Sequence, residues 1–179
     1  MTAQFEIAQL GHPVLRQKAQ AVDNITDDAF QGQLDALLDF VLARSGMGIA
    51  APQVGISQQF FILSSHPNQR YPYAPDIAPF VVINPSITWL SDTLIKDWEG
   101  CLSLPGIRAL VPRHDAIKVS YQTRQGDVVE MELNGFLSRV FQHEYDHLHG
   151  RVFLDRIEST QDVMMEQEWQ RQIIANPQA

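Results

Sequence analysis

The sequence of 179 residues contains a single cysteine, Cys101, so no disulfide bond can form within the chain. It also lacks an apolar run of about 18 residues, the length that a membrane-spanning helix needs. Residues 1–10 have neither the basic start nor the apolar stretch of a secretory signal peptide. These absences predict a cytoplasmic protein that does not enter a membrane.

Basic residues are scarce, with 13 Lys and Arg against 21 Asp and Glu and a net charge of −8. Nucleic acids bind clustered Lys and Arg, so this balance argues against direct nucleic-acid binding. The length suits one domain with a substantial core. We therefore expect a single domain over residues 1–179, and a monomer.

Among the residues that are present, the pattern His-Glu-Tyr-Asp-His at 143–147 carries the most chemical information. Positions four apart lie on one face of a helix, so His143 and His147 can share one metal ion. Glu144 can then serve as general base on a water at that metal. Two core histidines bonded to carbonyls are the alternative, but a carboxylate beside an apolar stripe needs a partner. The pattern predicts a metal-dependent hydrolase of an amide-type bond.

Catalytic sites of this kind normally have a third protein ligand, and the residues alone leave its identity open. A continuation as His-x-x-Gly-x-x-His fails, because Phe153 occupies its last position. A thiolate from Cys101 would suit zinc or ferrous iron, although a lone cysteine is often a buried core residue. Asp155, Glu166 and Glu168 are the other candidates, whereas His149 is only two residues past His147 and points to a different side.

A segment rich in small residues, Gly-Met-Gly-Ile-Ala-Ala-Pro-Gln at 46–53, is the next feature. Its glycines permit close approach of the backbone to an extended ligand. Gln53 offers an uncharged amide donor. The alternative is a tight turn packed behind the first helix.

Three segments in this order resemble the signature of the peptide deformylase family. They are residues 46–53, Glu-Gly-Cys-Leu-Ser at 99–103 and Gln-His-Glu-Tyr-Asp-His at 142–147, within a resemblance that covers roughly residues 5–157. The resemblance implies a catalytic domain that removes the formyl group from N-formyl-methionyl peptides, the new polypeptide chains, and releases formate.

The same resemblance implies roles for individual residues. It implies one divalent metal ion, Fe2+ in the cell with Zn2+, Ni2+ or Co2+ tolerated, on Cys101, His143 and His147. Glu144 would be the base, and the side chain of Gln53 and the backbone N–H of Leu102 would hold the oxyanion. We also expect a peptide strand to pair near Gly48, with Met47, Phe136 and Val140 lining a methionine pocket and Arg108 meeting the peptide further along.

Two other functions remain as alternatives. A metalloprotease or other amidase could use the same His-Glu-x-x-His helix, but it would need a third ligand other than Cys101. A non-catalytic peptide-binding protein of the same fold would normally lack a ligand or the base.

Periodicity predicts an α+β fold, with antiparallel β-sheets packed around a central helix that carries the His-Glu-x-x-His motif. Helices are expected at 26–45 and at 135–148, the latter ending before Gly150. Strands are expected at 59–64, 80–84, 87–91, 93–98, 116–122 and 127–133. The last two strands flank a turn at Gly126 and form a hairpin.

Two peripheral segments complete the expectation. We expect residues 66–79 to form a surface loop that decorates the molecule, and residues 159–175 to form a peripheral C-terminal helix capped by Ser159. Beyond Arg156 this segment has one basic residue, Arg171, against the acidic residues Glu158, Asp162, Glu166 and Glu168. Negative charge is repelled by ribosomal RNA, so weak or no ribosome docking is predicted.

Overall fold

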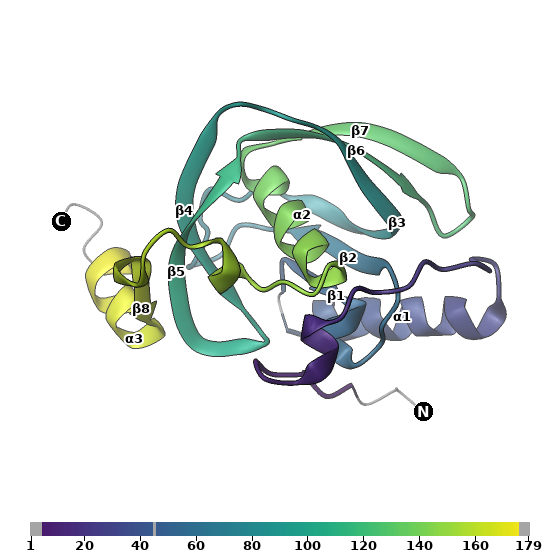
Figure 1. The fold of residues 1–179 in the computed structure, drawn as a ribbon, viewed down its shortest axis with the longest axis horizontal. Coiled ribbons are helices and arrows are strands. Elements are labelled where there is room, and N and C mark those ends of the chain that lie inside the picture. The colour runs from purple at the N-terminus through teal and green to yellow at the C-terminus, as the bar shows by residue number, and fades with distance from the viewer. Residues whose placement is uncertain (1–4, 45, 176–179) are drawn as a thin grey trace.

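The computed structural model describes residues 5–44 and 46–175. Figure 1 shows two curved sheets that surround a central helix, α2 (Gly135–Leu148). Every pairing between the named strands is antiparallel. The five-stranded sheet has the order β1 (Gly48–Ala50), β2 (Phe60–Ser65), β3 (Ile77–Leu90), β6 (Ala116–Gln122) and β7 (Val128–Asn134), and the three-stranded sheet has the order β4 (Leu94–Cys101), β5 (Leu104–His114) and β8 (Val163–Met165). The expected α+β class is confirmed.

Helix α1 (Asp28–Leu42) covers the outer side of β1 and β2. The Asp27 carboxylate caps it by accepting a 3.0 Å hydrogen bond from the backbone N–H of Phe30. Its apolar face joins strand residues in the first core cluster, which includes Phe30, Leu34, Leu37, Phe60 and Ile62. The helix is shorter than the expected 26–45, and Ser45 lies outside the described residues.

Strand β3 is one continuous strand where we predicted two, at 80–84 and 87–91. Pro85, which cannot donate to a ladder, lies between the two predicted strands. The strand instead passes this point through a register shift between Ile83 and Ser86, with Asn84 at a φ of 48°. The Asn84 side chain bonds both backbone groups of Val22, which stabilises the bulge.

The sequence analysis missed strands β1, β5 and β8. β1 lies in the segment 46–53, for which a tight turn was the alternative interpretation, and no strand was predicted for β5, which contains Pro105 and Pro112. In the ladder between β5 and β8, only Ile107–Ala109 of β5 are paired, so Pro105 and Pro112 do not have to donate hydrogen bonds there. The hairpin of β6 and β7 is paired as predicted.

Helix α2 packs between the sheets, and its buried residues join the second core cluster with Phe61, Val82 and Val119. It ends at Leu148, and Gly150 follows with a φ of 69°. A Cβ at Gly150 would lie 2.8 Å from the carbonyl carbon of Arg16, so only glycine fits. The expected end of this helix is therefore confirmed.

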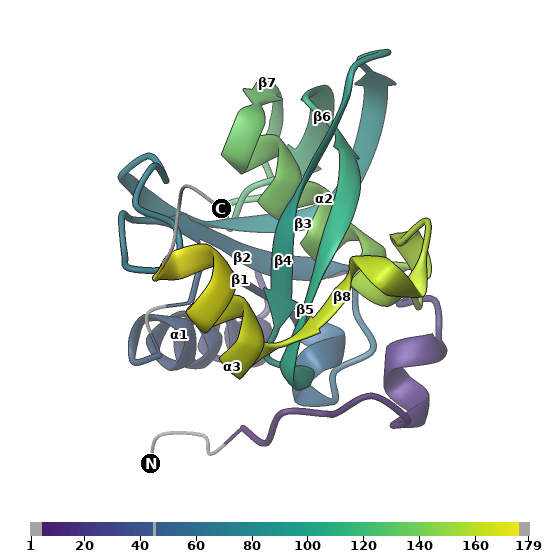
Figure 2. The ribbon, with the colours of Figure 1, turned by 90° about the vertical axis from the view of Figure 1, so that its left-hand side faces the viewer.

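The C-terminal segment differs from the helix expected over 159–175. Ser159 caps a short 3-10 turn, Thr160–Asp162, by accepting a hydrogen bond from the N–H of Gln161. Strand β8 follows, and helix α3 (Glu166–Trp169) begins only after it and continues as a π-helical turn, Gln170–Ile174. Pairing with β5 outweighs the local helical preference of these residues (Figure 2).

None of the helices in the described part of the chain is both long and apolar enough to cross a membrane.

Candidate metal centre and active site

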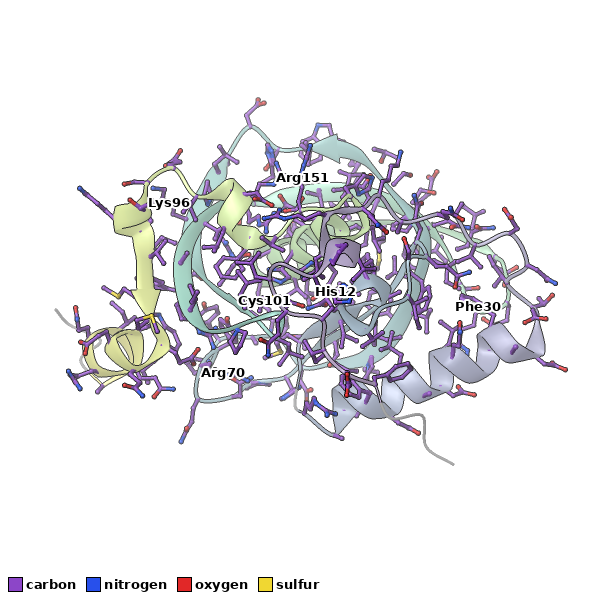
Figure 3. The ribbon with its side chains drawn as sticks, turned by 60° about the horizontal axis from the view of Figure 1, so that its bottom comes forward. His12, Phe30, Arg70, Lys96, Cys101 and Arg151 are labelled. Atoms are coloured by element: carbon purple, nitrogen blue, oxygen red, sulfur yellow. The ribbon has the colours of Figure 1, made fainter. Side chains whose placement is uncertain are left out.

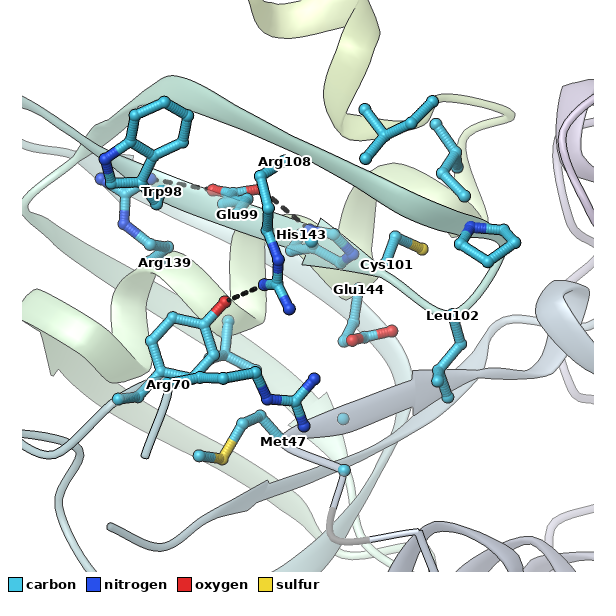
Figure 4. Close-up of a pocket in the computed structure, with 18 of the residues that line it drawn as sticks. Met47, Arg70, Trp98, Glu99, Cys101, Leu102, Arg108, Arg139, His143 and Glu144 are labelled. Carbon is cyan, nitrogen blue, oxygen red and sulfur yellow. Dashed lines mark hydrogen bonds and ion pairs between the residues drawn. The ribbon is translucent and has the colours of Figure 1, made fainter. Parts of the chain in front are cut away.

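Helix α2 and the end of β4 bring together Cys101, His143 and His147. Their ligand atoms all lie within 4.8 Å of one another, and Cys101 Sγ is 3.3 Å from His147 Nε2. One helical turn separates the two histidines, and a bulge between Glu99 and Cys101 directs the end of β4 toward them. Among the described residues, this cluster is the group that could hold a metal ion. Figure 4 shows two of its members, Cys101 and His143, beside the pocket.

Glu99 fixes the orientation of His143. Its Oε2 lies 2.9 Å from His143 Nδ1, while Nε and Nη2 of Arg113 and Nη1 of Arg139 donate to the same carboxylate at 2.9–3.0 Å. Burial alone would raise the pKa of Glu99, but the charge of Arg113 and hydrogen bonds from His143 and Arg113 hold that pKa well below its usual range. An ionised Glu99 keeps the proton of His143 on Nδ1, so Nε2 is free to bind a metal.

Asp146 extends this ion network below the site. It accepts a 2.6 Å bond from Nη1 of Arg113 and a 2.5 Å bond from Nη2 of Arg156. Both Arg113 and Asp146 are almost fully buried, with 4% and 3% of their side chains exposed. Breaking one partner of such a network leaves a buried charge uncompensated, so the position of α2 against β4 and β5 is strongly determined.

The thiol of Cys101 is prepared to ionise. Burial alone would raise its pKa, but the charge of His147 and hydrogen bonds from both histidines hold the pKa well below its usual range. The pKa of His143 is correspondingly held well above its ordinary value by hydrogen bonds to Cys101 and Glu99, against the effect of burial. A thiolate beside two imidazoles is a set of donors that suits a divalent transition metal.

Within the described part of the chain, two buried polar atoms near the cluster lack a hydrogen-bond partner: Oε2 of Glu144 and Nδ1 of His147. Only the Glu144 oxygen supports the fit, because Nε2 is the nitrogen of His147 that faces Cys101. Unsatisfied polar atoms are rare in protein interiors, and their presence beside the cluster is expected where a metal and its solvent or substrate belong. The donor set of Cys101, His143 and His147, together with the unpaired Glu144 oxygen, shows that these residues fit a metal ion.

Glu144 lies directly beside the two histidines, on the side that faces the pocket (Figure 4). Burial raises the pKa of Glu144 to about 7, while the positive charges of His143 and His147 oppose that rise. A carboxyl group with a pKa near neutrality can both accept and return a proton. A Cβ at Gly48 would lie 2.6 Å from Glu144 Oε1, so glycine is needed where β1 passes this side chain.

Gln53 presents its amide N–H groups to the cluster. Its Oε1 accepts a 2.8 Å hydrogen bond from the backbone N–H of Ala50, and its Nε2 lies 3.3 Å from Cys101 Sγ and 3.4 Å from Ser103 Oγ. Because the N–H of Ala50 must donate to the amide oxygen, the amide nitrogen of Gln53 is the end that points toward the cluster. Leu102, directly after Cys101, also lines the pocket and is 40% exposed.

The pocket next to the cluster lies against Gly48 of β1 and Gly100 of β4, and each of these strands forms an edge of its sheet. All five residues that we expected to contact a peptide line this pocket: Met47, Gly48, Arg108, Phe136 and Val140. Arg108 is 3% exposed, and its Nε and Nη2 bond Glu166 at 2.8 and 3.0 Å. Its charge is thus already balanced within the protein.

The other candidates for third ligand have partners elsewhere. Glu166 pairs with Arg108, and Glu168 pairs with Arg171. Oδ2 of Asp155 accepts from the N–H of Val152, and Nδ1 of His149 lies 2.9 Å from the carbonyl oxygen of Tyr145. Only Cys101 of the candidates joins the two histidines in the cluster found among the described residues.

Sequence reasoning missed the residues that support the ligands. Glu99 was noted only as part of a motif, and Arg113 was not noted at all. A signal was present on α2, because Arg139, His143 and Asp146 recur at positions i, i+4 and i+7, which lie on one face. Charged residues on the same helix face as metal ligands indicate a network of hydrogen bonds and ion pairs that orients those ligands.

The loop expected to decorate the surface was also misjudged. Its residues Arg70 and Tyr71 line the pocket, and the Tyr73 hydroxyl donates a 2.7 Å hydrogen bond to Asp97 of β4. Aromatic side chains within the loop pack on Phe136 of α2, which draws the loop inward.

Comparisons with known proteins agree with this geometry. The model of the polypeptide deformylase family matches residues 4–163. The chain belongs to this family. It is 49% identical over 170 residues to peptide deformylase 2 of Nostoc sp., covering 95% of both chains. It is 43% identical to peptide deformylase 2 of Shewanella oneidensis, over 90% of this chain and 89% of the other.

Solved deformylase structures share the fold. The class I type b peptide deformylase of Acinetobacter baumannii with Met-Ala-Ser bound gives a TM-score of 0.85 at 40% identity, over 88% of this chain and all 100% of the other. A Synechococcus elongatus deformylase in complex with actinonin gives 0.78 at 36% identity, over 88% and 81%. This deformylase-family chain is accordingly a metal-dependent hydrolase that releases formate from N-formyl-methionyl polypeptides.

Proposed function

We propose that Cys101, His143 and His147 hold the metal and that Glu144, Gln53 and Leu102 carry out deformylation around it. The observation that carries this proposal is the cluster of three ligand atoms with the buried, unpaired Glu144 oxygen beside it. When bound, a divalent cation supplies Lewis acidity and lowers the pKa of a coordinated water toward about 7.

Glu144 acts as the proton carrier. With a pKa of about 7, it takes a proton from the attacking water and then delivers it to the departing amine of the methionine. Its carboxylate lies against Gly48 of β1, so it faces the edge where the peptide backbone enters. Both proton transfers therefore occur on one side of the formyl carbon.

Gln53 and Leu102 stabilise the charge that develops on the formyl oxygen. The bond from Ala50 N–H leaves the amide N–H groups of Gln53 as donors, and the backbone N–H of Leu102 is the second donor in this proposal. One such donor contributes about 3–4 kcal/mol to lowering the barrier. Both groups are uncharged, so they act without adding a titrating group to the site.

The formylated peptide enters as a strand between the edges of the two sheets. Gly48 of β1 offers backbone pairing, and Met47, Phe136 and Val140 surround the methionine side chain. Arg108 forms the wall beyond them and is held in place by Glu166. Because Glu166 already balances the charge of Arg108, the arginine needs no acidic group from the peptide, and its role is to shape the pocket.

Fe2+ is the ion that we propose for the cell, with Zn2+, Ni2+ or Co2+ as substitutes, because thiolate and imidazole donors accept all four. We also propose a monomeric, single catalytic domain in the cytoplasm, where formylated chains are made. Weak or no ribosome docking through the C-terminal segment, and no direct contact with nucleic acid, follow from its acidic composition and the net charge of −8.

The deciding experiment compares formyl-Met-Ala-Ser with unformylated Met-Ala-Ser, using anaerobically purified protein of measured metal content. We expect release of formate from the first peptide and no cleavage of the second. Removal of the metal by a chelator should abolish turnover, and Fe2+ should restore it. Cleavage of a peptide bond in Met-Ala-Ser would indicate the metalloprotease alternative, and binding without turnover would indicate a non-catalytic protein.

A further inference from the structure

The loop of residues 66–76 is fixed over the pocket. The ring of Tyr71 packs against Phe136 with centroids 5.2 Å apart, and its hydroxyl accepts a 2.9 Å hydrogen bond from Nη1 of Arg108. The side-chain oxygen of Asn68 accepts hydrogen bonds of 2.9 Å from the backbone N–H groups of Arg70 and Tyr71. The backbone that carries Arg70 is therefore held at the mouth of the pocket.

Arg70 differs from the other arginines around the pocket because, among the described residues, no ion pair holds its guanidinium. Its charge does act on Glu166, but that carboxylate is bonded to Arg108, so one carboxylate lies near two arginines. Arg108 is bonded through two nitrogens to Glu166, and Arg139 donates to Glu99. Within residues 5–44 and 46–175, no hydrogen bond or ion pair joins the Arg70 guanidinium to another residue. In a chain of net charge −8, this leaves a positive group at the entrance to the site.

The Arg70 side chain also points into the pocket. Figure 4 shows its guanidinium reaching into the pocket, between Met47 and Glu144 in that view, and Figure 3 shows Arg70 on the same open side as Cys101. Arg70 is exposed, so a bound molecule can reach it without displacing other parts of the protein. Both Arg70 and Met47, which we place beside the methionine side chain, line the pocket, so a peptide bound there extends within reach of Arg70 in this proposal.

We propose that Arg70 is a specificity-determining residue that favours substrates with an Asp or Glu side chain at the second or third position, directly after the formyl-methionine. The proposal rests on the deformylase function and names a substrate class for the same site. A formylated N-terminus carries no positive charge, so it does not compete for nearby carboxylates. An acidic side chain at the entrance would pair with the free guanidinium, whereas a Lys side chain would be repelled.

The expected size of the preference follows from the exposure of Arg70. Ion pairs at exposed sites are weak, so we expect kcat/KM to differ about two- to fivefold between acidic and neutral peptides. The preference should shrink as ionic strength rises, because exposed charges are screened.

The test uses two sets of C-terminally amidated peptides, formyl-Met-X-Ala-Ala and formyl-Met-Ala-X-Ala, where X is Glu, Gln or Lys. Amidation removes the terminal carboxylate, so only the side chain of X carries the variable charge. Formate release should be fastest for Glu and slowest for Lys in at least one set. Arg70→Glu should reverse this order, and Arg70→Lys should keep it.

A matched control is Arg151→Glu, which makes the same change in charge at an exposed arginine outside the pocket. It should leave the order of peptides unchanged. Equal preference for all peptides in the natural protein would overturn the proposal, as would an order that Arg70→Glu does not alter. A reversal caused equally by Arg151→Glu would also overturn it, by assigning the preference to net charge.

A second measurement separates this inference from the deformylase function. Dissociation constants for the unformylated products of both sets, Met-X-Ala-Ala-amide and Met-Ala-X-Ala-amide with X as Glu or Lys, are measured by calorimetry and do not depend on turnover. Absence of formate release with every peptide would reject the function. A ratio of dissociation constants that favours Glu, and that Arg70→Glu reverses, would still support the role of Arg70, and equal constants would reject it.

Discussion

The floor and the rim of the pocket are built differently. The floor, which we define as Glu99, Cys101, Arg113, His143 and His147, consists of buried or half-buried side chains, and the Glu99 carboxylate alone accepts hydrogen bonds from two arginines and a histidine. The rim, which we define as the 66–76 loop with the pair of Arg108 and Glu166, depends on fewer contacts, and Arg70 has none from its guanidinium among the described residues.

The difference teaches how one pocket can combine fixed chemistry with adjustable recognition. Ligands and base must keep their positions to a fraction of an ångström, so Glu99 holds the ring of His143 and close packing against Gly48 restricts the Glu144 carboxylate. Rim residues select what enters, and weak contacts there can change without disturbing the floor. Substitutions in the floor should therefore abolish activity or metal binding, whereas those in the rim should alter preference or modestly lower stability.

The largest effect is expected from Glu144→Gln. The amide cannot take the proton, so kcat/KM for formyl-Met-Ala-Ser should fall about 10²- to 10⁴-fold while the metal content stays the same. Formate assays and metal analysis check this together. The exposed Glu132→Gln serves as the control and should behave as the unchanged protein. Unchanged turnover in Glu144→Gln would remove the proposed base.

Glu99→Gln should weaken metal binding. Loss of the carboxylate that orients His143 is expected to lower metal affinity about 10- to 100-fold. Arg113 and Arg139 would also lose their shared partner, which should reduce the free energy of unfolding by about 3–5 kcal/mol. Competition with a metal-binding dye and denaturant unfolding measure the two effects. Full affinity in a folded variant would show that Glu99 does not position His143.

Gly48→Ala tests the close contact between strand β1 and the Glu144 carboxylate. The added methyl group would press on the Glu144 carboxylate and shift it, so kcat should fall about tenfold with metal retained. Gly32→Ala is the matched control, because nothing lies within 4 Å of a Cβ there. On helix α1 that change should stabilise the protein by about 1 kcal/mol. Equal kinetics in both variants would contradict the role of close packing at Gly48.

The smallest effect is expected at the rim, from Glu166→Gln. Arg108 would lose a charged partner, which should lower the free energy of unfolding by about 1 kcal/mol at pH 7. The pKa of Glu166 is lowered by hydrogen bonding and charge from Arg108, against the effect of burial. This stabilisation is thus present above the unfolded pKa of about 4.3 and is lost as pH falls through the lower folded value.

Denaturant unfolding at a series of pH values measures this difference between Glu166→Gln and the unchanged protein. The gap should be constant near neutrality and close in acid. Glu168→Gln is the control, because Glu168 lies on the same helix but pairs with the exposed Arg171. A gap that persists at low pH would show that the Arg108 pair is not its source.

The sequence predicted the features that depend on residues close together in the chain, and it missed those that depend on residues far apart. Helical spacing predicted that His143 and His147 share a face, and alternation predicted the hairpin of β6 and β7, because both patterns are local. β5 was missed because Pro105 and Pro112 argue against a strand, while its pairing with β4 and β8 depends on residues far away in the chain. The same reason explains β8, where pairing with β5 overrides a helical pattern.

By itself, the sequence determined the reactive groups: one thiol, two imidazoles one helical turn apart and a carboxylate next to the first of them. It could do so because the identity and spacing of such groups are written along the chain. Only the tertiary structure decided that Glu99 supports His143, that Glu166 is engaged by Arg108 and that Arg70 lines the pocket without an ion pair to any described residue. Those relations depend on which distant segments pack together, since the stability of a buried charge is set by its neighbours in space.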